Sequence, residues 1–364
     1  MKPDDQATIL SSDGEAETEW WYYHGHLHTD AGEFGFHLVF FRRCTKKIKI
    51  GRIIHGRHFY DNAWFAHLSI CDVKTKTFHY GERRSGRGSS TSIPSVQVAE
   101  WSVYESNGVH QLSAVSNAYQ LDLELTPAKA TSKNHINNAF VKTPGDETTY
   151  QTITRMHVQG QLTVNGTRYP TKGTAWMDRE SGSFKLNQHL SGWDWFAIQT
   201  QDQHELMIYR MRDVKGNTTP RSIAVISQPD GSSETSSLDD WQIVPTRYWL
   251  SKKTGIRYPV DWRITETNMK IDLRLTARVD HAEMDARGSS YMIYWEGPVA
   301  VSGTMSGKEI QASAYMELVG HNSNRYLGSY DYERENLPFL DWIYSSARYL
   351  FNRKGVTISH SART

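Results

Sequence analysis

The chain has 364 residues, and its 41 basic residues are balanced by 40 acidic ones, which argues against the strongly basic surface typical of nucleic-acid-binding proteins. Its two cysteines, Cys44 and Cys71, are too few for a disulfide framework and are predicted to be reduced thiols. Apolar residues make up only 38%, but 12 Trp, 19 Tyr and 12 Phe supply much of the area that a core needs, so we expect pockets walled by rings.

Strands are predicted along almost the whole chain, because apolar and polar residues alternate as they do in strands with one buried face. The clearest stretches, in chain order, are Phe34–Phe41, Trp64–Ile70, Tyr119–Leu125 and Ile271–Val279. Turn signals such as Asn165-Gly166 separate the strands. Near the end, Leu337–Phe351 has the apolar spacing of a helix, which predicts one short C-terminal helix packed across a barrel wall.

An internal repeat divides the chain. Trp20-Trp21-Tyr22-Tyr23 is matched by Trp193-Asp194-Trp195-Phe196, and Leu121–Thr126 is matched by Ile271–Thr276. After a glycine turn in each copy, Ala175-Trp176-Met177-Asp178 is matched by Ala314-Tyr315-Met316-Glu317. Because these matches occur in the same order, we predict an all-β chain of two tandem antiparallel barrels, residues 1–188 and 189–364, joined near residues 186–191. Trp176 and Tyr315 should then be equivalent.

Four carboxyl groups next to aromatic residues are the candidate acids: Asp194, Asp178, Glu180 and Glu296. A carboxyl group in an apolar, ring-lined site has a raised pKa and can donate a proton near neutral pH. The alternative is a buried carboxylate that pairs with arginine and holds strands together. Asp194 ranks first because it lies between two tryptophans near the junction, although strand alternation lets either Asp194 or Trp195 face the lumen, but hardly both.

Aromatic residues in the same motifs are the candidate substrate-binding residues. At least four of seven rings are expected to line one cavity, in or between the barrels. The seven are Trp20, Tyr22, Trp64, Trp176, Trp195, Tyr209 and Trp295. His24 is added as a substrate-binding residue, and it or His26 is a possible proton shuttle at the pocket.

No metal or cofactor is expected. His24, His26 and His28 share one strand face and, with His37 or His67, have the composition of a metal site, but no acidic partner is spaced alongside them. The sequence has no nucleophile elbow, P-loop or dinucleotide fingerprint. An activity would therefore depend on acid–base chemistry or on the shape of the site alone.

Several motifs resemble those of a known family. They are Glu19-Trp20-Trp21-Tyr22-Tyr23-x-Gly25-x-Leu27, Phe34-Gly35-Phe36-His37-Leu38-x-Phe40-Phe41-Arg42, Thr154-Arg155-Met156, Gly173–Glu180, Gly192-Trp193-Asp194-Trp195-Phe196-Ala197-x-Gln199 and Glu205-Leu206-Met207-x-Tyr209-Arg210. Together they resemble the AttH/carotenoid 1,2-hydratase family, also called hydroxyneurosporene synthase-like, over residues 19–320.

The resemblance implies two lipocalin-like domains and hydration of C=C bonds without a cofactor. The better understood members add water to acyclic carotenoids, and more distant lipocalin-like relatives are cyclases of natural-product pathways, including Diels–Alderases. Two positions depart from the family pattern. Ser181 stands where family members usually carry an aromatic residue, directly after Asp178-Arg179-Glu180, and Asp194 stands where carotenoid hydratases carry a histidine.

The leading hypothesis is a cofactor-free hydratase or cyclase, a lyase or isomerase, that acts on a hydrophobic terpenoid, polyene or polyketide of secondary metabolism. Its alternatives are a pericyclase of the Diels–Alderase kind and a non-catalytic carrier of a hydrophobic ligand. The expected partner is a hydrophobic small molecule; nucleic acid is not expected, and peripheral membrane contact stays open. Met1–Glu19 lacks the apolar core of a signal peptide, so the expected location is cytoplasmic, with a processed secreted form as the alternative.

Overall fold

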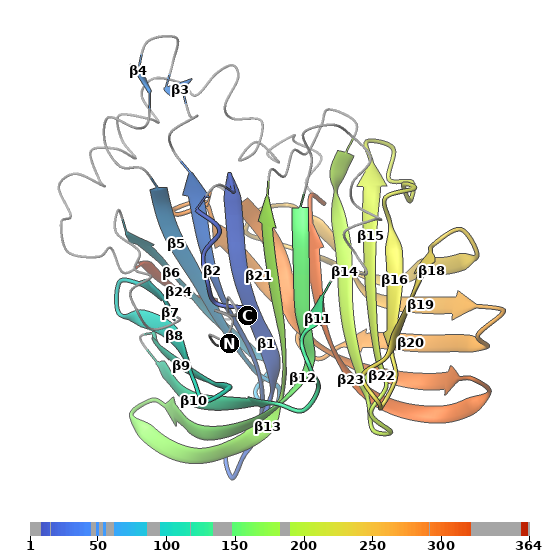
Figure 1. Ribbon diagram of the computed structural model, residues 1–364, viewed down its shortest axis with the longest axis horizontal. Coiled ribbons are helices and arrows are strands. Elements are labelled where there is room, and N and C mark those ends of the chain that lie inside the picture. The colour runs from blue at the N-terminus through green and yellow to red at the C-terminus, as the bar shows by residue number, and fades with distance from the viewer. Residues whose placement is uncertain are drawn as a thin grey trace, which may run out of the picture.

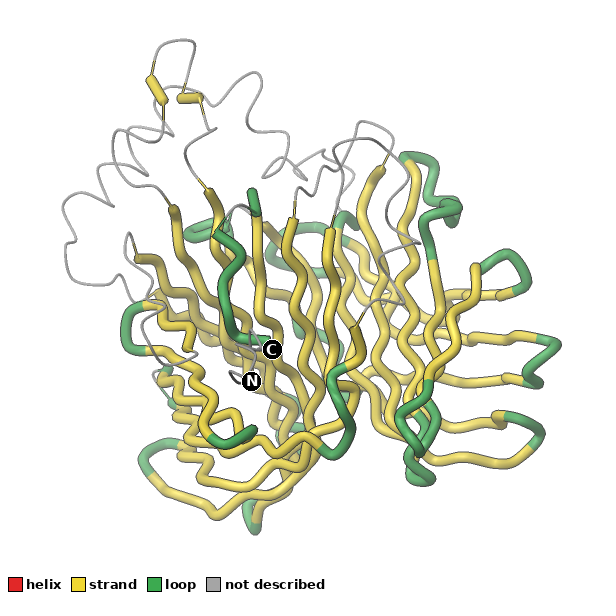
Figure 2. The backbone as a smooth tube through the Cα atoms, viewed as in Figure 1, coloured by secondary structure: helices red, strands yellow, loops and turns green. Residues whose placement is uncertain are grey.

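Two large antiparallel sheets stand side by side in the computed structural model (Figure 1). The first is blue to green apart from its red edge strand near the C-terminus, and the second is yellow-green to orange. The structure describes residues 9–14, 16–44, 49–50, 54–55, 62–85, 95–116, 118–133, 148–182, 190–290, 292–321 and 358–362. Within these ranges all regular structure is strand, and no helix occurs (Figure 2). The fold is therefore all-β with two barrel-like sheets, as predicted; the helix expected at 337–351 lies outside the described residues.

The first sheet has the strand order β24-β6-β5-β2-β1-β13-β12-β10-β9-β8-β7, and β11 pairs with β12. Its strands are β1 (Thr18–Thr29), β2 (Gly32–Cys44), β5 (Asn62–Asp72), β6 (Thr77–Ser85), β7 (Ser95–Val98), β8 (Trp101–Ser106), β9 (Val109–Val115), β10 (Tyr119–Pro127), β11 (Ser132–Lys133), β12 (Thr148–Val164), β13 (Thr167–Gly182) and β24 (Ile358–Ala362). The pair β3 (Lys49–Ile50) and β4 (Ile54–His55) forms a separate ladder.

The second sheet has the order β17-β16-β15-β14-β23-β22-β20-β19-β18, and β21 pairs with β22. Its strands are β14 (Leu190–Thr200), β15 (Glu205–Asp213), β16 (Ile223–Ser227), β17 (Ser233–Ser237), β18 (Trp241–Leu250), β19 (Arg257–Glu266), β20 (Ile271–Ala277), β21 (Glu283–Ala286), β22 (Met292–Met305) and β23 (Lys308–Val319).

The strand orders of the two sheets correspond, and so do their registers. In the first sheet β1 pairs with β13, and His24 stands opposite Trp176. In the second sheet β14 pairs with β23, and Ala197 stands opposite Tyr315. Trp176 and Tyr315 therefore occupy equivalent positions, as the repeat predicts. The same registers make Asp178 equivalent to Glu317, and Thr152 equivalent to Glu296.

Strand β1 is buried on both faces, and alternate side chains go to different hydrophobic clusters. Trp21 and Tyr23 point into the interior of the first sheet, where they belong to a cluster with residues of β2, β5 and β10. Tyr22 belongs to the other cluster, which fills the second sheet and the space between the sheets. The second face of β1 is thus an inter-sheet surface.

The two sheets approach closely. A Cβ at Gly35 of β2 would lie 2.7 Å from Cγ of Pro298 on β22, so only glycine fits at this crossing. Gln199 Nε2 donates to the carbonyl oxygens of Thr154 and Ala175, at 2.8 and 3.1 Å. These contacts fix the faces of β1, β12 and β13 against β14, β22 and β23.

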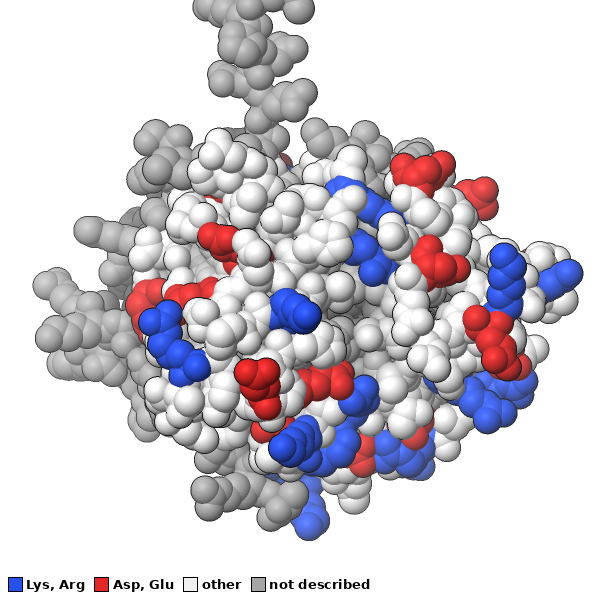
Figure 3. All heavy atoms as spheres, turned by 90° about the horizontal axis from the view of Figure 1, so that it is seen from below, with Lys and Arg blue, Asp and Glu red and all other residues white. Residues whose placement is uncertain are grey.

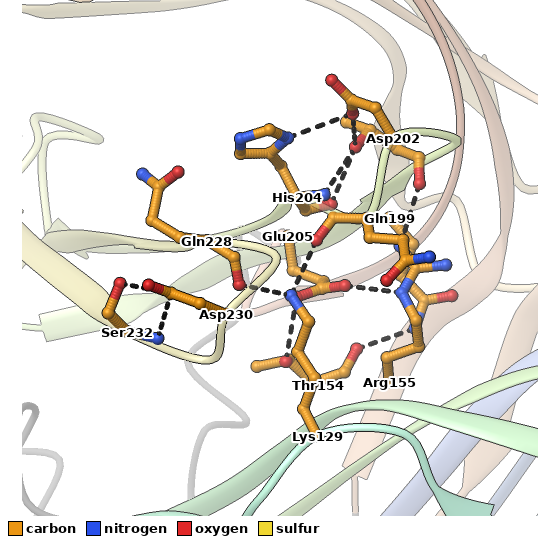
Figure 4. A network of polar contacts seen from close by, with 12 residues as sticks. Lys129, Thr154, Arg155, Gln199, Asp202, His204, Glu205, Gln228, Asp230 and Ser232 are labelled. Carbon is orange, nitrogen blue, oxygen red and sulfur yellow. Dashed lines mark hydrogen bonds and ion pairs between the residues drawn. The ribbon is translucent and has the colours of Figure 1, made fainter.

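A buried carboxylate also joins the sheets. Glu205 of β15 is fully buried and accepts hydrogen bonds from Lys129 Nζ and Arg155 Nε, both at 2.6 Å, and from Thr154 Oγ1 at 3.1 Å (Figure 4). Its three partners all come from the first sheet or the segment beside it. On the outside, the face seen from below carries acidic and basic residues intermixed among uncharged ones (Figure 3).

Candidate active site between the sheets

Aromatic and histidine rings from both sheets meet around Tyr22. The Tyr22 ring lies 5.2 Å from His24, 5.1 Å from His37 and 5.7 Å from Trp195, the last edge-on. His24 lies 4.9 Å from the ring of Tyr315. All five residues are buried. We call this group, together with the carboxyl groups described next, the inter-sheet cluster.

Glu296 is the most unusual residue of the cluster. Its side chain comes from β22 and is fully buried. Tyr22 donates a hydrogen bond of 2.6 Å to Oε1, whereas no described residue is a partner of Oε2. Burial, and then the nearby charge of Glu317, raises the pKa of Glu296 well above its ordinary value. The raised pKa favours the carboxylic acid over the carboxylate, and its proton can sit on the oxygen that has no partner among the described residues.

Three more carboxyl groups of the cluster have raised pKa values. Burial raises the pKa of Asp178 to about 7, of Glu180 to about 8 and of Glu317 to about 7. Trp176 Nε1 donates to Asp178 and Trp193 Nε1 donates to Glu317, both at 2.8 Å. These indole hydrogen bonds favour the ionised forms but do not offset burial. The carboxyl groups of the cluster therefore gain and lose protons near neutral pH.

The histidines of the cluster have the opposite property. Burial, and then the neighbouring histidines, lowers the pKa of His24 and of His37 well below the ordinary value. Both are therefore neutral imidazoles. Nε2 of each lacks a hydrogen-bond partner among the described residues. A buried polar atom without a partner is costly, so these nitrogens and Glu296 Oε2 favour a ligand or water that supplies hydrogen bonds.

Asp194 does not share this environment, and its expected raised pKa is wrong. It is fully buried and contacts Arg210 at 2.8 Å, Arg212 at 3.2 Å and His321 Nε2 at 2.7 Å. Burial raises the pKa of Asp194, but the charge of Arg212 and the contact with His321 outweigh it and leave the pKa below its ordinary value. Trp195, the next residue, points into the inter-sheet cluster, so Asp194 points into the second sheet.

The predicted substrate-binding rings fall into separate places. Tyr22, Trp176 and Trp195 lie together with His24, and the Trp176 and Trp195 rings are 6.1 Å apart. Tyr209 packs edge-on against Trp193 at 6.2 Å, and partly buried Trp20 lies opposite Glu180 in the register. Trp64 stacks on Trp21 inside the first sheet, and Trp295 donates to the carbonyl oxygen of Asp280. Neither of these last two rings contacts Tyr22.

The family model described as AttH-like matches residues 8–321. The chain belongs to the AttH-like family. Among solved structures, an AttH-assigned protein from Nitrosomonas europaea has 24% identity and a TM-score of 0.74, over 85% of this chain and 95% of its own. No curated protein sequence matches.

Two further structures share the fold of this AttH-like chain at lower identity. Kievitone hydratase from Nectria haematococca has 15% identity and a TM-score of 0.63, over 83% of this chain and 88% of its own. The protein CghA has 11% identity and a TM-score of 0.51, over 84% and 88%. At these identities the likeness extends to the fold, and any activity must be argued from the side chains.

Sequence reasoning missed Glu317 and Tyr315 as site residues of the AttH-like chain. A signal was present, because both lie in the tetrapeptide that repeats the one holding Trp176 and Asp178. Among the described residues, no three His, Cys, Asp or Glu side chains are grouped so as to hold a metal ion. The described part of the chain also contains no helix long and apolar enough to span a membrane.

Proposed function

We propose that this AttH-like protein is a hydratase or cyclase that protonates a C=C bond of a hydrophobic substrate held between the two sheets, with Glu296 as the acid. One observation carries the proposal: a fully buried carboxyl group among aromatic rings has one oxygen held by Tyr22, and its other oxygen has no partner in the described part of the chain. A carboxyl group with a raised pKa keeps its proton closer to neutral pH, so it can act as a general acid there.

The reaction starts when the proton on Glu296 Oε2 moves to one alkene carbon and leaves a carbocation on the other. The hydrogen bond from Tyr22 stabilises the carboxylate that forms, and the faces of Trp176 and Trp195 stabilise the cation. Capture of the cation by water gives an alcohol once a neutral imidazole has taken the extra proton. Capture by a second alkene gives a ring, and loss of a proton completes the isomer.

His24 and His37 are the residues of this chain that we assign as the base. Each is neutral, and its Nε2 has no hydrogen-bond partner within the described ranges. The ring centroids of His24 and His37 lie 5.2 and 5.1 Å from that of Tyr22. A neutral imidazole accepts the proton of an attacking water and later releases it. The name of the related kievitone hydratase supports hydration as the reaction class. A terpenoid, polyene or polyketide remains our proposal for the substrate.

A carrier is the less favoured function. A carrier needs no acid, and its buried carboxylates are expected to be paired with cations, as Glu205 and Asp194 are. The four carboxyl groups of the inter-sheet cluster instead have raised pKa values and no arginine or lysine among the causes of their shifts. Four carboxyl groups with raised pKa values in one buried place favour proton transfer.

The experiment is turnover in D2O of a panel of acyclic carotenoids, prenylated phenols and linear polyenes, followed by mass spectrometry. Acid catalysis places one solvent deuteron on a product carbon, whereas a pericyclic reaction places none. We expect Glu296→Gln to abolish turnover, since the amide keeps the shape but is not an acid. Glu283→Gln is the matched control, because Glu283 is a buried glutamate outside the cluster that accepts from Ser251 and Thr254.

Two outcomes would overturn the proposal. Full deuterium incorporation by Glu296→Gln would exclude Glu296 as the donor. Product formation without any deuterium would exclude acid catalysis and leave preorganisation of the substrate as the mechanism.

A further inference from the structure

A second chain of buried polar groups leaves the inter-sheet cluster at Tyr294. The Tyr294 hydroxyl lies 2.8 Å from His67 Nδ1, and His67 Nε2 lies 2.9 Å from Ser289 Oγ. Ser289 Oγ in turn lies 2.5 Å from Glu82 Oε2. All four residues are at most 5% exposed, so the chain runs through protein and not along the surface.

The chain crosses between the sheets. His67 and Glu82 are cross-strand partners on β5 and β6 of the first sheet. Tyr294 is on β22 of the second sheet, and Ser289 lies in the turn that precedes it. Four side chains from opposite sheets have therefore been brought into an unbroken line of hydrogen bonds, which packing alone does not require.

Two continuous arrangements of the hydrogen bonds along this line are compatible with its donors and acceptors. Burial lowers the pKa of His67 to about 3, so the ring is neutral and has one N–H and one bare nitrogen. If Glu82 is ionised, Ser289 donates to it, His67 donates from Nε2 and Tyr294 donates to Nδ1. If Glu82 is protonated, each bond can reverse, and His67 then carries its proton on Nδ1. The tautomer of His67 therefore links the protonation state of Glu82 to the direction of the hydrogen bond at Tyr294.

The inner end of the line adjoins the inter-sheet cluster. The Tyr294 ring packs edge-on against His37 at 6.3 Å, and Tyr294 and Glu296 are alternate residues on the same face of β22. The Tyr294 hydroxyl also lies 3.0 Å from Met284 Sδ, a weak acceptor to which it can donate its hydrogen bond in the reversed state.

The outer end lies just below the surface. Arg84 of β6 and Asp285 of β21 are the charged groups that act on Glu82, in addition to Ser289. Arg84 reaches the carbonyl oxygen of Gly288 at an exposed position, and Asp285 pairs with the exposed side chains of Lys253 and Arg287. Glu82 is thus one layer of side chains away from solvent.

We propose that Tyr294, His67, Ser289 and Glu82 form a proton relay between the inter-sheet cluster and the protein surface, and that the charge state of Glu82 sets its direction. The role in turnover rests on the proposed function; the relay itself does not. With Glu82 ionised, the Tyr294 oxygen accepts the proton that the neighbouring His37 has taken from the attacking water, while its own proton moves to His67 Nδ1. The Nε2 proton of His67 moves to Ser289, and the Ser289 proton moves to Glu82. The line thereby takes up one proton at Tyr294, and Glu82 becomes protonated.

The test reads the tautomer of His67 directly by NMR of protein labelled with ¹⁵N-histidine, across the pH at which Glu82 titrates. Burial raises the pKa of Glu82 to about 7. We expect the proton of His67 to sit on Nδ1 at pH values below this and on Nε2 above it. His67→Gln identifies the signal by its loss.

Two variants keep the test decisive. Glu82→Gln and Ser289→Ala should each remove the pH dependence of the His67 tautomer, the first by removing the titrating group and the second by breaking the line. A tautomer that stays fixed across this range in the unaltered protein would overturn the proposal, as would a pH dependence that survives in both variants.

Turnover separates this proposal from the proposed function. If the tautomer switches but Glu296→Gln remains active, the relay stands and Glu296 is not the acid. If the tautomer switches and Glu296 is the acid, Tyr294→Phe and Ser289→Ala should lower kcat by a similar factor and leave KM unchanged. Unchanged kcat in both variants would show that the relay does not serve turnover and would overturn that part of the proposal.

Discussion

Asp194 and Glu296 are both fully buried carboxyl groups on central strands of the second sheet, yet their surroundings are opposite. Asp194 is enclosed by Arg210, Arg212 and His321, and its pKa is lowered. Among the residues that the structure describes, Glu296 has a tyrosine hydroxyl as its one hydrogen-bond partner, and its pKa is raised well above the ordinary value. Burial is the same in both cases, so the partners decide whether a carboxyl group holds the fold together or stores a proton.

The first sheet also contains a buried carboxylate that is held by arginines, as Asp194 is in the second sheet. Glu19 is fully buried and contacts Arg42 Nε at 2.5 Å and Arg179 Nη2 at 2.8 Å. By register, Arg42 is equivalent to Arg212 of the second sheet. Each sheet therefore has a fully buried carboxylate held by two arginines, whereas Glu296 has a threonine, Thr152, at its equivalent position. The residue at the Glu296 position therefore differs between the two sheets, whereas the arginine-held carboxylates occur in both.

The largest expected effect comes from breaking the Asp194 ion pair. Asp194→Asn leaves two arginines, one of them well buried, without their counter-charge, and should lower the free energy of unfolding by about 3–5 kcal/mol. Urea unfolding near neutral pH measures this. Glu296→Gln, which replaces one neutral group by another, should change the same quantity by less than about 1 kcal/mol. Equal losses in the two variants would contradict the distinction between the two sites.

An intermediate effect is expected in the pH dependence of stability. The folded pKa values of Asp178, Glu180 and Glu317 lie above their unfolded values, so the folded state binds more protons and stability falls as the pH rises toward about 8. Below about pH 6.5 the buried neutral histidines act in the opposite direction, because the unfolded chain then binds their protons. The clean window is therefore from about pH 6.5 to 8.

Glu180→Gln tests this sign. The variant removes the carboxyl group whose pKa is raised to about 8, and should make the fall in stability across the window shallower by on the order of 1 kcal/mol. Thermal or urea unfolding at a series of pH values measures the slope. A slope that is flat or positive in the unaltered protein would mean that these carboxyl groups are ionised at neutral pH.

The smallest expected effect is a shift within the cluster itself. Glu317 stands opposite Glu296 in the register, and its charge helps to raise the pKa of Glu296. Glu317→Gln should therefore lower the pKa of Glu296, so that the infrared carbonyl band of the protonated acid disappears at a lower pH. Glu283→Gln serves again as the control. An unmoved band would assign the whole shift of Glu296 to burial.

The sequence was sufficient to predict the all-β fold, the duplication and the family, because the repeated motifs keep both their order and their register. It was not sufficient to place the site. Trp20 to Leu27 are apolar, aromatic or histidine on both faces of β1, so periodicity does not say which face meets the second sheet. The same ambiguity made Asp194 the first choice for the acid, whereas its neighbour Trp195 faces the cluster.

The relay residues could not have been found from spacing. Glu82 and His67 are adjacent in space through strand pairing, but Ser289 and Tyr294 come from the other half of the chain. No local pattern marks a contact that forms only when two sheets pack. The predicted substrate-binding rings are separated for a similar reason. Trp64 and Trp295 lie in aromatic motifs like that of Trp176, but Trp64 packs in the interior of the first sheet and Trp295 donates to the carbonyl oxygen of Asp280.

The Glu205 network has a consequence for cooperativity. The carboxylate belongs to the second sheet, and both of its cations, Lys129 and Arg155, belong to the first-sheet half of the chain. If the first sheet unfolds, Glu205 loses both counter-charges at once, and the second sheet loses stability at the same moment. A chain with two sheets of corresponding strand order is thereby expected to melt as a single thermodynamic unit, with one transition in calorimetry, and a repeat in sequence need not be a repeat in folding.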